Sequence, residues 1–229
     1  MVNELLWLMF MLLSLSAVLL AYRFFGKTGL YCMIVINIIV ANLQVVKTVE
    51  LFGLVATLGN ILYGSIFLAT DILNENHGKA DARKGVWFGF GAFILMVVFM
   101  QIGLWFVPHE SDFAQPFLEG LFGIMPRILV GSLVAYIISQ HHDVWAFNMW
   151  KEKFKGKYLW LRNNLSTLVS QLIDSIVFCT IAFLGVWDMN VWWQILLTTY
   201  LFKLIVAVVD TPFIYIARLY KKNVDKLEK

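Results

Sequence analysis

Long apolar runs separated by short polar connections make up most of the chain. A membrane helix needs about 20 mostly apolar residues to cross the hydrocarbon of a bilayer. Seven segments meet this length, at residues 5–22, 29–46, 51–73, 85–107, 117–140, 165–186 and 191–217. The pattern therefore predicts an all-α, polytopic membrane protein with seven spans. The last segment is long enough to tilt or break, and Pro212 predicts the position of a break.

Lysine and arginine are unevenly distributed among the connections between these segments. Alternate connections, starting after residue 22 and ending with the C-terminal tail, hold 15 of these cations, whereas the other set holds only Lys47. Because cytoplasmic connections are enriched in Lys and Arg, we expect an external N-terminus and a cytoplasmic C-terminus, in the plasma (inner) membrane. We expect no cleaved signal peptide, because Glu4 stands where cations are usual and Arg23 follows the first apolar run.

The composition also indicates lipid as the solvent of this protein. Of 229 residues, 60% are hydrophobic and 14% charged, which is too little charge to cover a soluble domain of this size. No linker or basic stretch interleaved with aromatics interrupts the chain, so we expect one membrane domain over residues 1–229 and no nucleic-acid partner. Residues 141–164 are rich in aromatics and lysines, which favours a helix along the cytoplasmic membrane surface.

Enzyme and metal signatures are weak in this chain. Glu75 and His77 do not stand in the His-Glu-x-x-His order of a zinc protease, and residues 85–91 lack the lysine of a phosphate-binding loop. His141 and His142 would point about 100° apart on a helix, so a solvated pair is favoured over a metal site. We therefore expect no enzymatic activity and no cofactor.

Three charged residues are expected deep within the membrane. Arg127 and Lys203 are the two cations inside predicted spans, and Asp174 lies at a similar depth, roughly 15–18 Å below the outer face at 1.5 Å per residue. Such charges cost about 2.5–3.5 kcal/mol each at mid-bilayer, so they usually pair and mark function. Two interpretations compete: mutual neutralisation that fixes helix packing, or a polar cavity for a solute. A proton relay through Asp174 is a third.

Neighbouring residues favour the cavity for a solute. Gln171, Asp174 and Phe178 share one face of the sixth segment, at steps of three and four residues. Asn42 and Asn60 add amide groups from the second and third segments. A carboxylate accepts two parallel N–H bonds, amides donate and accept, and an aromatic ring stacks on flat molecules. This set would suit a flat heterocycle with donor and acceptor edges.

Four motifs in order along the chain resemble the queuosine precursor transporter family, also described as a vitamin uptake transporter family. They are TDILNENHGKADARK (70–84), QHHDVWAFNMWKEK (140–153), RNNLSTLVSQLIDSIVF (162–178) and FKLIVAVVDTPFIY (202–215). The resemblance covers about residues 29–218 and implies six core helices, so the segment at 5–22 is an extra N-terminal span. It also implies an inner-membrane importer of deazaguanine bases, such as the cyano- or aminomethyl-substituted forms, or queuine.

Site residues follow from combining this resemblance with the expected depths. Family motif positions match Asp71, Glu75, Arg83, Asp143 and Arg162. Because the topology places Asp71 and Glu75 near the cytoplasmic end of the third segment, we expect them to line an inner gate.

The base would be bound closer to the centre of the membrane. We expect Asp174 to accept from its donor edge, Phe178 to stack on its ring, and Lys203, Arg127, Gln171 or an Asn to donate to its carbonyl. Secondary or facilitated transport is the leading mechanism. The alternatives are a substrate-capture subunit with a separate energising complex, or transport of another small vitamin-like heterocycle. For protein partners, a homo-oligomer and an energising complex both stay open.

Overall fold

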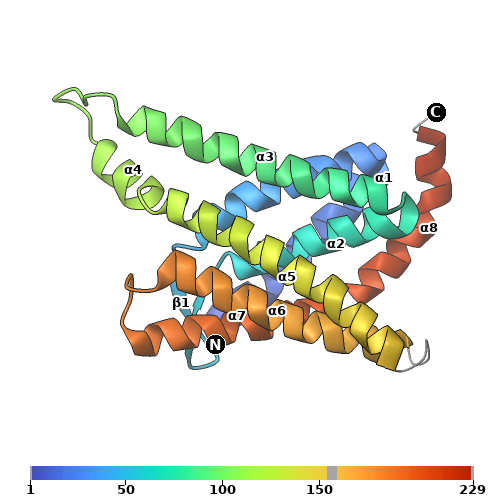
Figure 1. Ribbon diagram of the computed structural model, residues 1–229. Coiled ribbons are helices and arrows are strands. Elements are labelled where there is room, and N and C mark those ends of the chain that lie inside the picture. The colour runs from blue at the N-terminus through green and yellow to red at the C-terminus, as the bar shows by residue number, and fades with distance from the viewer. Residues whose placement is uncertain (1, 154–158, 228–229) are drawn as a thin grey trace.

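The computed structural model describes residues 2–153 and 159–227, and almost all of them are helical. The elements are α1 (Val2–Gln44), β1 (Thr48–Leu51), β2 (Leu54–Thr57), α2 (Asn60–Asn76), α3 (Lys79–Leu104), α4 (Gln115–Phe122), α5 (Met125–Lys153), α6 (Leu159–Phe183), α7 (Met189–Val209) and α8 (Thr211–Leu227). The long helices form an elongated bundle in which α5 and α6 lie side by side (Figure 1). The expectation of an all-α protein is therefore confirmed, apart from one short β-hairpin.

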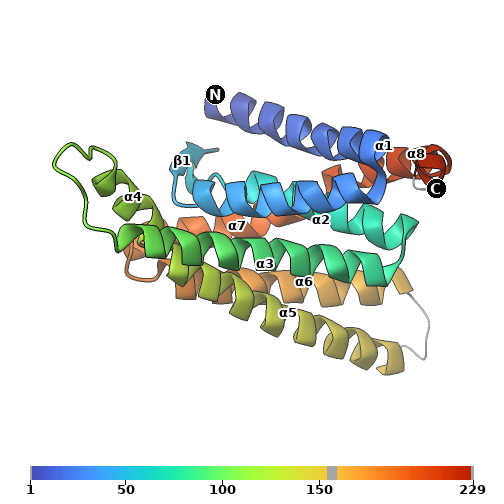
Figure 2. The same ribbon diagram turned by 90° about the horizontal axis from the view of Figure 1, so that it is seen from above.

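Helix α1 contains both of the first two predicted segments, because the chain reverses direction within it. Gly26 adopts φ 58° and ψ −145°, a conformation that side chains with a Cβ rarely allow. The residues before and after it form two helical arms that run in opposite directions (Figure 2). The arms approach closely near the turn: a Cβ atom on Gly29 would lie 2.3 Å from the carbonyl oxygen of Ala21.

The third segment, predicted to be helical from residue 51, becomes helical only at Asn60. Instead of a helix from residue 51, the structure has an antiparallel β-hairpin, and α2 starts at Asn60. Phe52 and Gly53 form its two-residue turn with φ values of 53° and 78°, as the right-handed twist of a β-hairpin favours. A short apolar run rich in Val and Thr fits a strand as well as a helix, and hydrophobic periodicity alone does not separate the two.

The other helices also differ from the predicted segments at their ends. The segment at 117–140 is divided into α4 and α5, and α5 continues to Lys153. The separate surface helix expected at 141–164 is therefore wrong for residues 141–153, and residues 154–158 lie outside the described chain. The break expected near Pro212 is confirmed, because α7 ends at Val209 and α8 starts at Thr211.

Several helices have the length and apolar character of membrane spans. Within the described residues these are Val2–Gln44, Lys79–Leu104, Gln115–His142 and Met189–Val206, and Leu168–Phe183 is a shorter apolar helix. On α3, the side chains of Leu95, Phe99 and Ile102 are exposed on the outside of the bundle. Large apolar side chains on an outer surface are stable where the surroundings are lipid, so the structure fits a polytopic membrane protein.

Helix α2 lies at the centre of the fold and positions the candidate site. It packs against α1, α3, α7 and α8, and its residues Leu68, Ile72 and Leu73 are fully buried. Its opposite face meets side chains from α5 and α6 across an internal space. The buried face anchors α2, so the polar residues on its other face have defined positions.

Candidate functional site

A cavity of about 740 Å³ lies between α2, α3, α5, α6 and α7, with two side chains from α1 at its edge. Its volume is within the usual range of small-molecule sites, about 300–1,000 Å³. The lining combines aromatic, amide and charged groups; the most relevant are Asn60, Tyr63, Phe67, Asp71, Lys79, Arg83, Phe90, Tyr136, Gln140, Gln171, Asp174, Phe178 and Lys203. The cavity therefore offers ring-stacking surfaces and hydrogen-bonding groups to one solute.

An ion pair between α6 and α7 marks one end of the cavity. The Lys203 ammonium group bonds to Oδ2 of Asp174 and lies 3.4 Å from the hydroxyl of Ser175. The hydroxyl of Ser139 donates to Asp174 Oδ1 at 3.3 Å. Only 8% of the Lys203 side chain and 21% of the Asp174 side chain are exposed. Each charge neutralises the other, so this end of the cavity carries no net charge from the pair.

Arg127 does not join this pair, although its predicted depth placed it there. Its Nε atom donates to the carbonyl of Ile181 at 2.6 Å, and its Nη2 atom donates to the carbonyl of Leu184. Ile181 lies in the last turn of α6 and Leu184 directly follows the helix, where carbonyl acceptors are left without helical partners. Arg127 is exposed and caps α6, and it does not line the cavity.

Gln171 lines the same end of the cavity and has an unused acceptor. Its Oε1 atom is buried and has no hydrogen-bond partner in the described chain. A buried polar atom without a partner costs free energy, and a ligand that donates a hydrogen bond removes that cost. Phe178, two turns further along α6, also lines the cavity and packs edge-on against Phe183 at 5.3 Å between ring centroids.

The two asparagines predicted for the site have different positions. Asn60 lines the cavity and donates to the hydroxyls of Thr57 and Thr199, at 3.2 and 3.3 Å. Asn42 lies behind the cavity wall, where it donates to the carbonyl of Ile38 and accepts a 3.1 Å hydrogen bond from the hydroxyl of Tyr63. Asn42 therefore holds the hydroxyl of Tyr63, which lines the cavity, and does not line the cavity itself.

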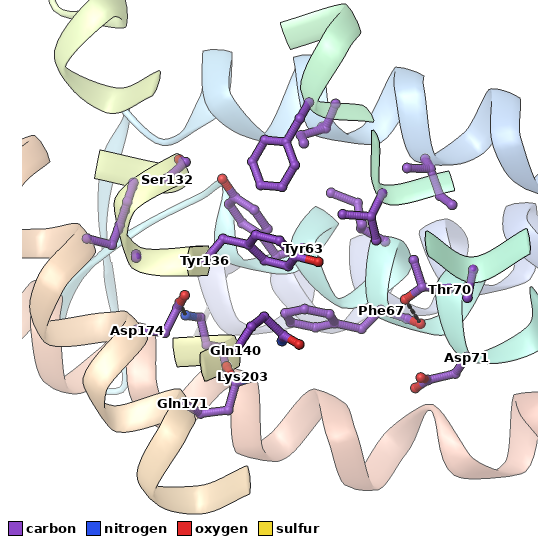
Figure 3. Close-up of a pocket in the computed structure, with 18 of the residues that line it drawn as sticks. Tyr63, Phe67, Thr70, Asp71, Ser132, Tyr136, Gln140, Gln171, Asp174 and Lys203 are labelled. Atoms are coloured by element: carbon purple, nitrogen blue, oxygen red, sulfur yellow. Dashed lines mark hydrogen bonds and ion pairs between the residues drawn. The ribbon is translucent and has the colours of Figure 1, made fainter. Parts of the chain in front are cut away.

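Aromatic residues in the middle of the cavity were missed by reasoning from the sequence. Figure 3 shows the rings of Tyr63, Phe67 and Tyr136 between the Asp174–Lys203 end and the Asp71 end. The ring of Phe90 lies 5.1 Å from that of Tyr136. A signal was present, because Tyr63 and Phe67 share a helical face with Asn60 at steps of three and four residues.

The opposite end of the cavity contains charged residues from α2 and α3. Asp71 and Thr70 lie at this end in Figure 3, and Lys79 and Arg83 also line the cavity. Glu75, expected beside Asp71, faces the outside, where its carboxylate lies 3.3 Å from the Arg218 guanidinium. Only one of the two expected carboxylates therefore reaches the cavity.

Two further predicted motif residues are not part of this geometry. The side chains of Asp143 and Arg162 lie outside the described residues, although their backbones belong to α5 and α6.

Residues 57–217 match a family described as "Putative vitamin uptake transporter". The chain belongs to this family. All lining residues of the cavity except Ile34 and Ile38 fall within the matched range. The expectation of a transporter family, and not an enzyme family, is confirmed.

Curated relatives agree with this family and extend the similarity to nearly the whole chain. The chain is 48% identical over 219 residues to the "Probable queuosine precursor transporter" of Bacillus subtilis (strain 168), which covers 95% of this chain and 96% of the relative. It is 28% identical over 194 residues to the "Queuosine precursor transporter" of Escherichia coli (strain K12), covering 82% and 85% of the two chains. No solved structure matches the chain.

Proposed function

We propose that this protein imports queuosine precursors, deazaguanine bases, across the plasma membrane and binds them in the cavity described above. The observation that carries this proposal is the juxtaposition of an ion pair, a free amide acceptor and several aromatic rings in one internal cavity. The names of the relatives give the class of substrate, and the cavity supplies the groups that such a base requires.

The base would bind across the Asp174–Lys203 pair. A deazaguanine presents a ring N–H and an exocyclic amine as parallel donors, which a carboxylate accepts at two oxygens. Its carbonyl would accept from the Lys203 ammonium, while Phe178, Tyr63 or Tyr136 stacks on the ring. Both buried charges keep a partner when the base replaces their mutual bond, so binding does not leave an isolated charge. Gln171 Oε1 would take a further donor of the base.

The inner end of the cavity would form the exit. Asp71 and Arg83 are the lining residues that we assign to a cytoplasmic gate, together with the family positions Asp143 and Arg162. Glu75 would act from outside the cavity, through its ion pair with Arg218. In the proposed topology seven helical passes cross the membrane, with the N-terminus outside, the first arm of α1 as the added helix, and the cations of α8 in the cytoplasm.

Replacement of Asp174 by Asn tests the assignment of the base site. Asn presents an N–H₂ group where the carboxylate accepts, so Asp174→Asn should reduce uptake of a radiolabelled cyano-substituted deazaguanine by about tenfold or more per molecule of folded protein in the membrane. Asp112→Asn is a matched control, because Asp112 is exposed in the connection between α3 and α4. Normal uptake by Asp174→Asn would contradict the assignment.

Purified protein in liposomes distinguishes independent transport from an energising complex. We expect base exchange across the liposome membrane without any added subunit. Binding of the base without exchange would identify the chain as a capture subunit. Restoration of tRNA modification in a strain unable to make the precursor, supplied with each candidate base, would then identify the exact base.

A further inference from the structure

A second cavity is formed by the N-terminal part of the chain and is separate from the base site. Its volume is about 340 Å³, and its walls come from both arms of α1, from β1 and from the start of α2. Asn60 lines the base site, whereas the next residue, Ile61, lines this second cavity. Among its described lining residues, only Leu58 and Ile61 fall within the range that matches the family.

Two buried polar atoms belong to residues that line this cavity and have no hydrogen-bond partner in the described chain. They are the indole Nε1 of Trp7, a donor, and Oε1 of Gln44, an acceptor. Trp7 is only 7% exposed, and a buried indole N–H usually finds a partner. The hydrocarbon of a bilayer supplies no such partner, so each unpaired group is costly there. A ligand that carries both an acceptor and a donor would satisfy the two atoms together.

The charged residue in the lining of this cavity is Lys47. It is exposed, and no ion pair joins it to a carboxylate within the residues that the structure describes. The acidic residues nearest in the sequence and on the facing arm, Glu50 and Glu4, do not line the cavity, and Glu4 accepts a 3.2 Å hydrogen bond from the N–H of Phe52. The charge of the lining therefore favours an anionic group on the ligand.

Most of the remaining lining is apolar and adjoins the outer surface of the bundle. Leu6 lines the cavity and is 56% exposed, and its neighbours Leu5 and Met9 on the first arm are exposed as well. Such side chains contact acyl chains in a membrane, so a lipid can enter the cavity from the side. Water would find few polar partners between walls such as Leu6 and Phe10, whereas an acyl chain suits them.

We propose that this cavity binds an anionic phospholipid of the outer leaflet whose headgroup carries a hydroxyl group. The phosphate accepts hydrogen bonds from the Lys47 ammonium group and from Trp7 Nε1, and the headgroup hydroxyl donates to Gln44 Oε1. One acyl chain lies along Leu6 and Phe10. The choice of leaflet rests on the proposed topology, whereas the binding itself does not depend on import of the base.

Trp7 connects the lipid cavity to the neighbourhood of the base site. Its ring packs against that of Phe202 on α7, at 5.1 Å between ring centroids, and Phe202 directly precedes Lys203. A lipid bound to the indole N–H fixes this ring and so supports α7 next to the Asp174–Lys203 pair. The lipid is thus a structural ligand of the first arm of α1.

Photo-crosslinking of the full-length protein in lipid nanodiscs tests this site. A phosphatidylglycerol with a photoactivatable acyl chain should crosslink to residues 2–10 and 44–61, mapped by mass spectrometry, and phosphatidylcholine with the same chain should react there far less. Lys47→Gln should reduce the phosphatidylglycerol crosslinks in these segments about fivefold. Gln44→Leu should reduce them without changing those of phosphatidylcholine. Lys222→Gln, the same change at an exposed lysine of α8, should leave them unchanged.

Each other outcome would overturn the lipid site and leave the import function untouched. Equal crosslinking by the two lipids would contradict recognition of the headgroup, and absence of crosslinks from both segments would contradict binding in the cavity. Displacement of the lipid by the cyano-substituted deazaguanine would identify a second site for the solute instead. If Lys47→Gln does not fold, the comparison of the two lipids on wild type decides the question by itself.

Discussion

The two ends of the base cavity differ in how their charged groups are paired. At the Asp174–Lys203 end, a carboxylate and an ammonium group neutralise each other, with Ser139 and Ser175 as additional partners. At the Asp71 end, Asp71, Lys79 and Arg83 line the cavity, and no ion pair joins them within the described residues. In the proposed function, the paired end binds the base and the end with separate charges forms the gate.

The largest loss of stability is expected from removing one partner of the Asp174–Lys203 ion pair. Lys203→Met leaves Asp174 as an isolated buried charge, which should lower the stability of the folded protein by about 3–5 kcal/mol. Thermal unfolding in detergent measures this loss. The double variant Lys203→Met with Asp174→Asn serves as the control, because it removes both charges and should recover most of the stability. Equal destabilisation of the single and double variants would contradict the role of the pair.

Gln171→Leu, at the same end of the cavity, should weaken binding of the base without lowering the stability of the protein. It removes a buried acceptor without a partner, so the free energy of unfolding should stay equal or rise by about 1–3 kcal/mol. Base affinity should fall about tenfold, because the hydrogen bond proposed for the base is lost. Direct binding of the labelled base and thermal unfolding provide the two measurements. Unchanged affinity would exclude Gln171 from the base site.

Glu75→Gln tests whether the outward-facing carboxylate of α2 contributes to the inner end. Its pair with Arg218 is half-exposed, with 49% and 56% of the two side chains accessible, so its loss should cost about 0.2–1 kcal/mol. Uptake should remain close to that of wild type. A severe loss of uptake with normal stability would show that Glu75 acts in the gate, contrary to its position in this conformation.

Much of the local structure could be predicted from the sequence. Apolar runs predicted most of the helices, Pro212 predicted the break before α8, and residue depth placed Asp174 and Lys203 at one level. The beginning of α2 could not be predicted, because the run at 48–57 is short and forms strands that pack against other elements. Val55 shows this: its N–H donates to Gln194 of α7, and its carbonyl accepts from Thr198.

The sequence by itself determined a polytopic helical protein, because hydrophobic length and helical spacing are local properties of the chain, and its four ordered motifs indicated the transporter family. Tertiary structure decided which residues of equal depth meet. Arg127 caps α6, Asn42 supports Tyr63 from behind, and Glu75 pairs with Arg218 outside the cavity that Asp71 lines. Depth along a helix gives only one coordinate, and the rotation and neighbours of each helix depend on packing between segments far apart in the chain.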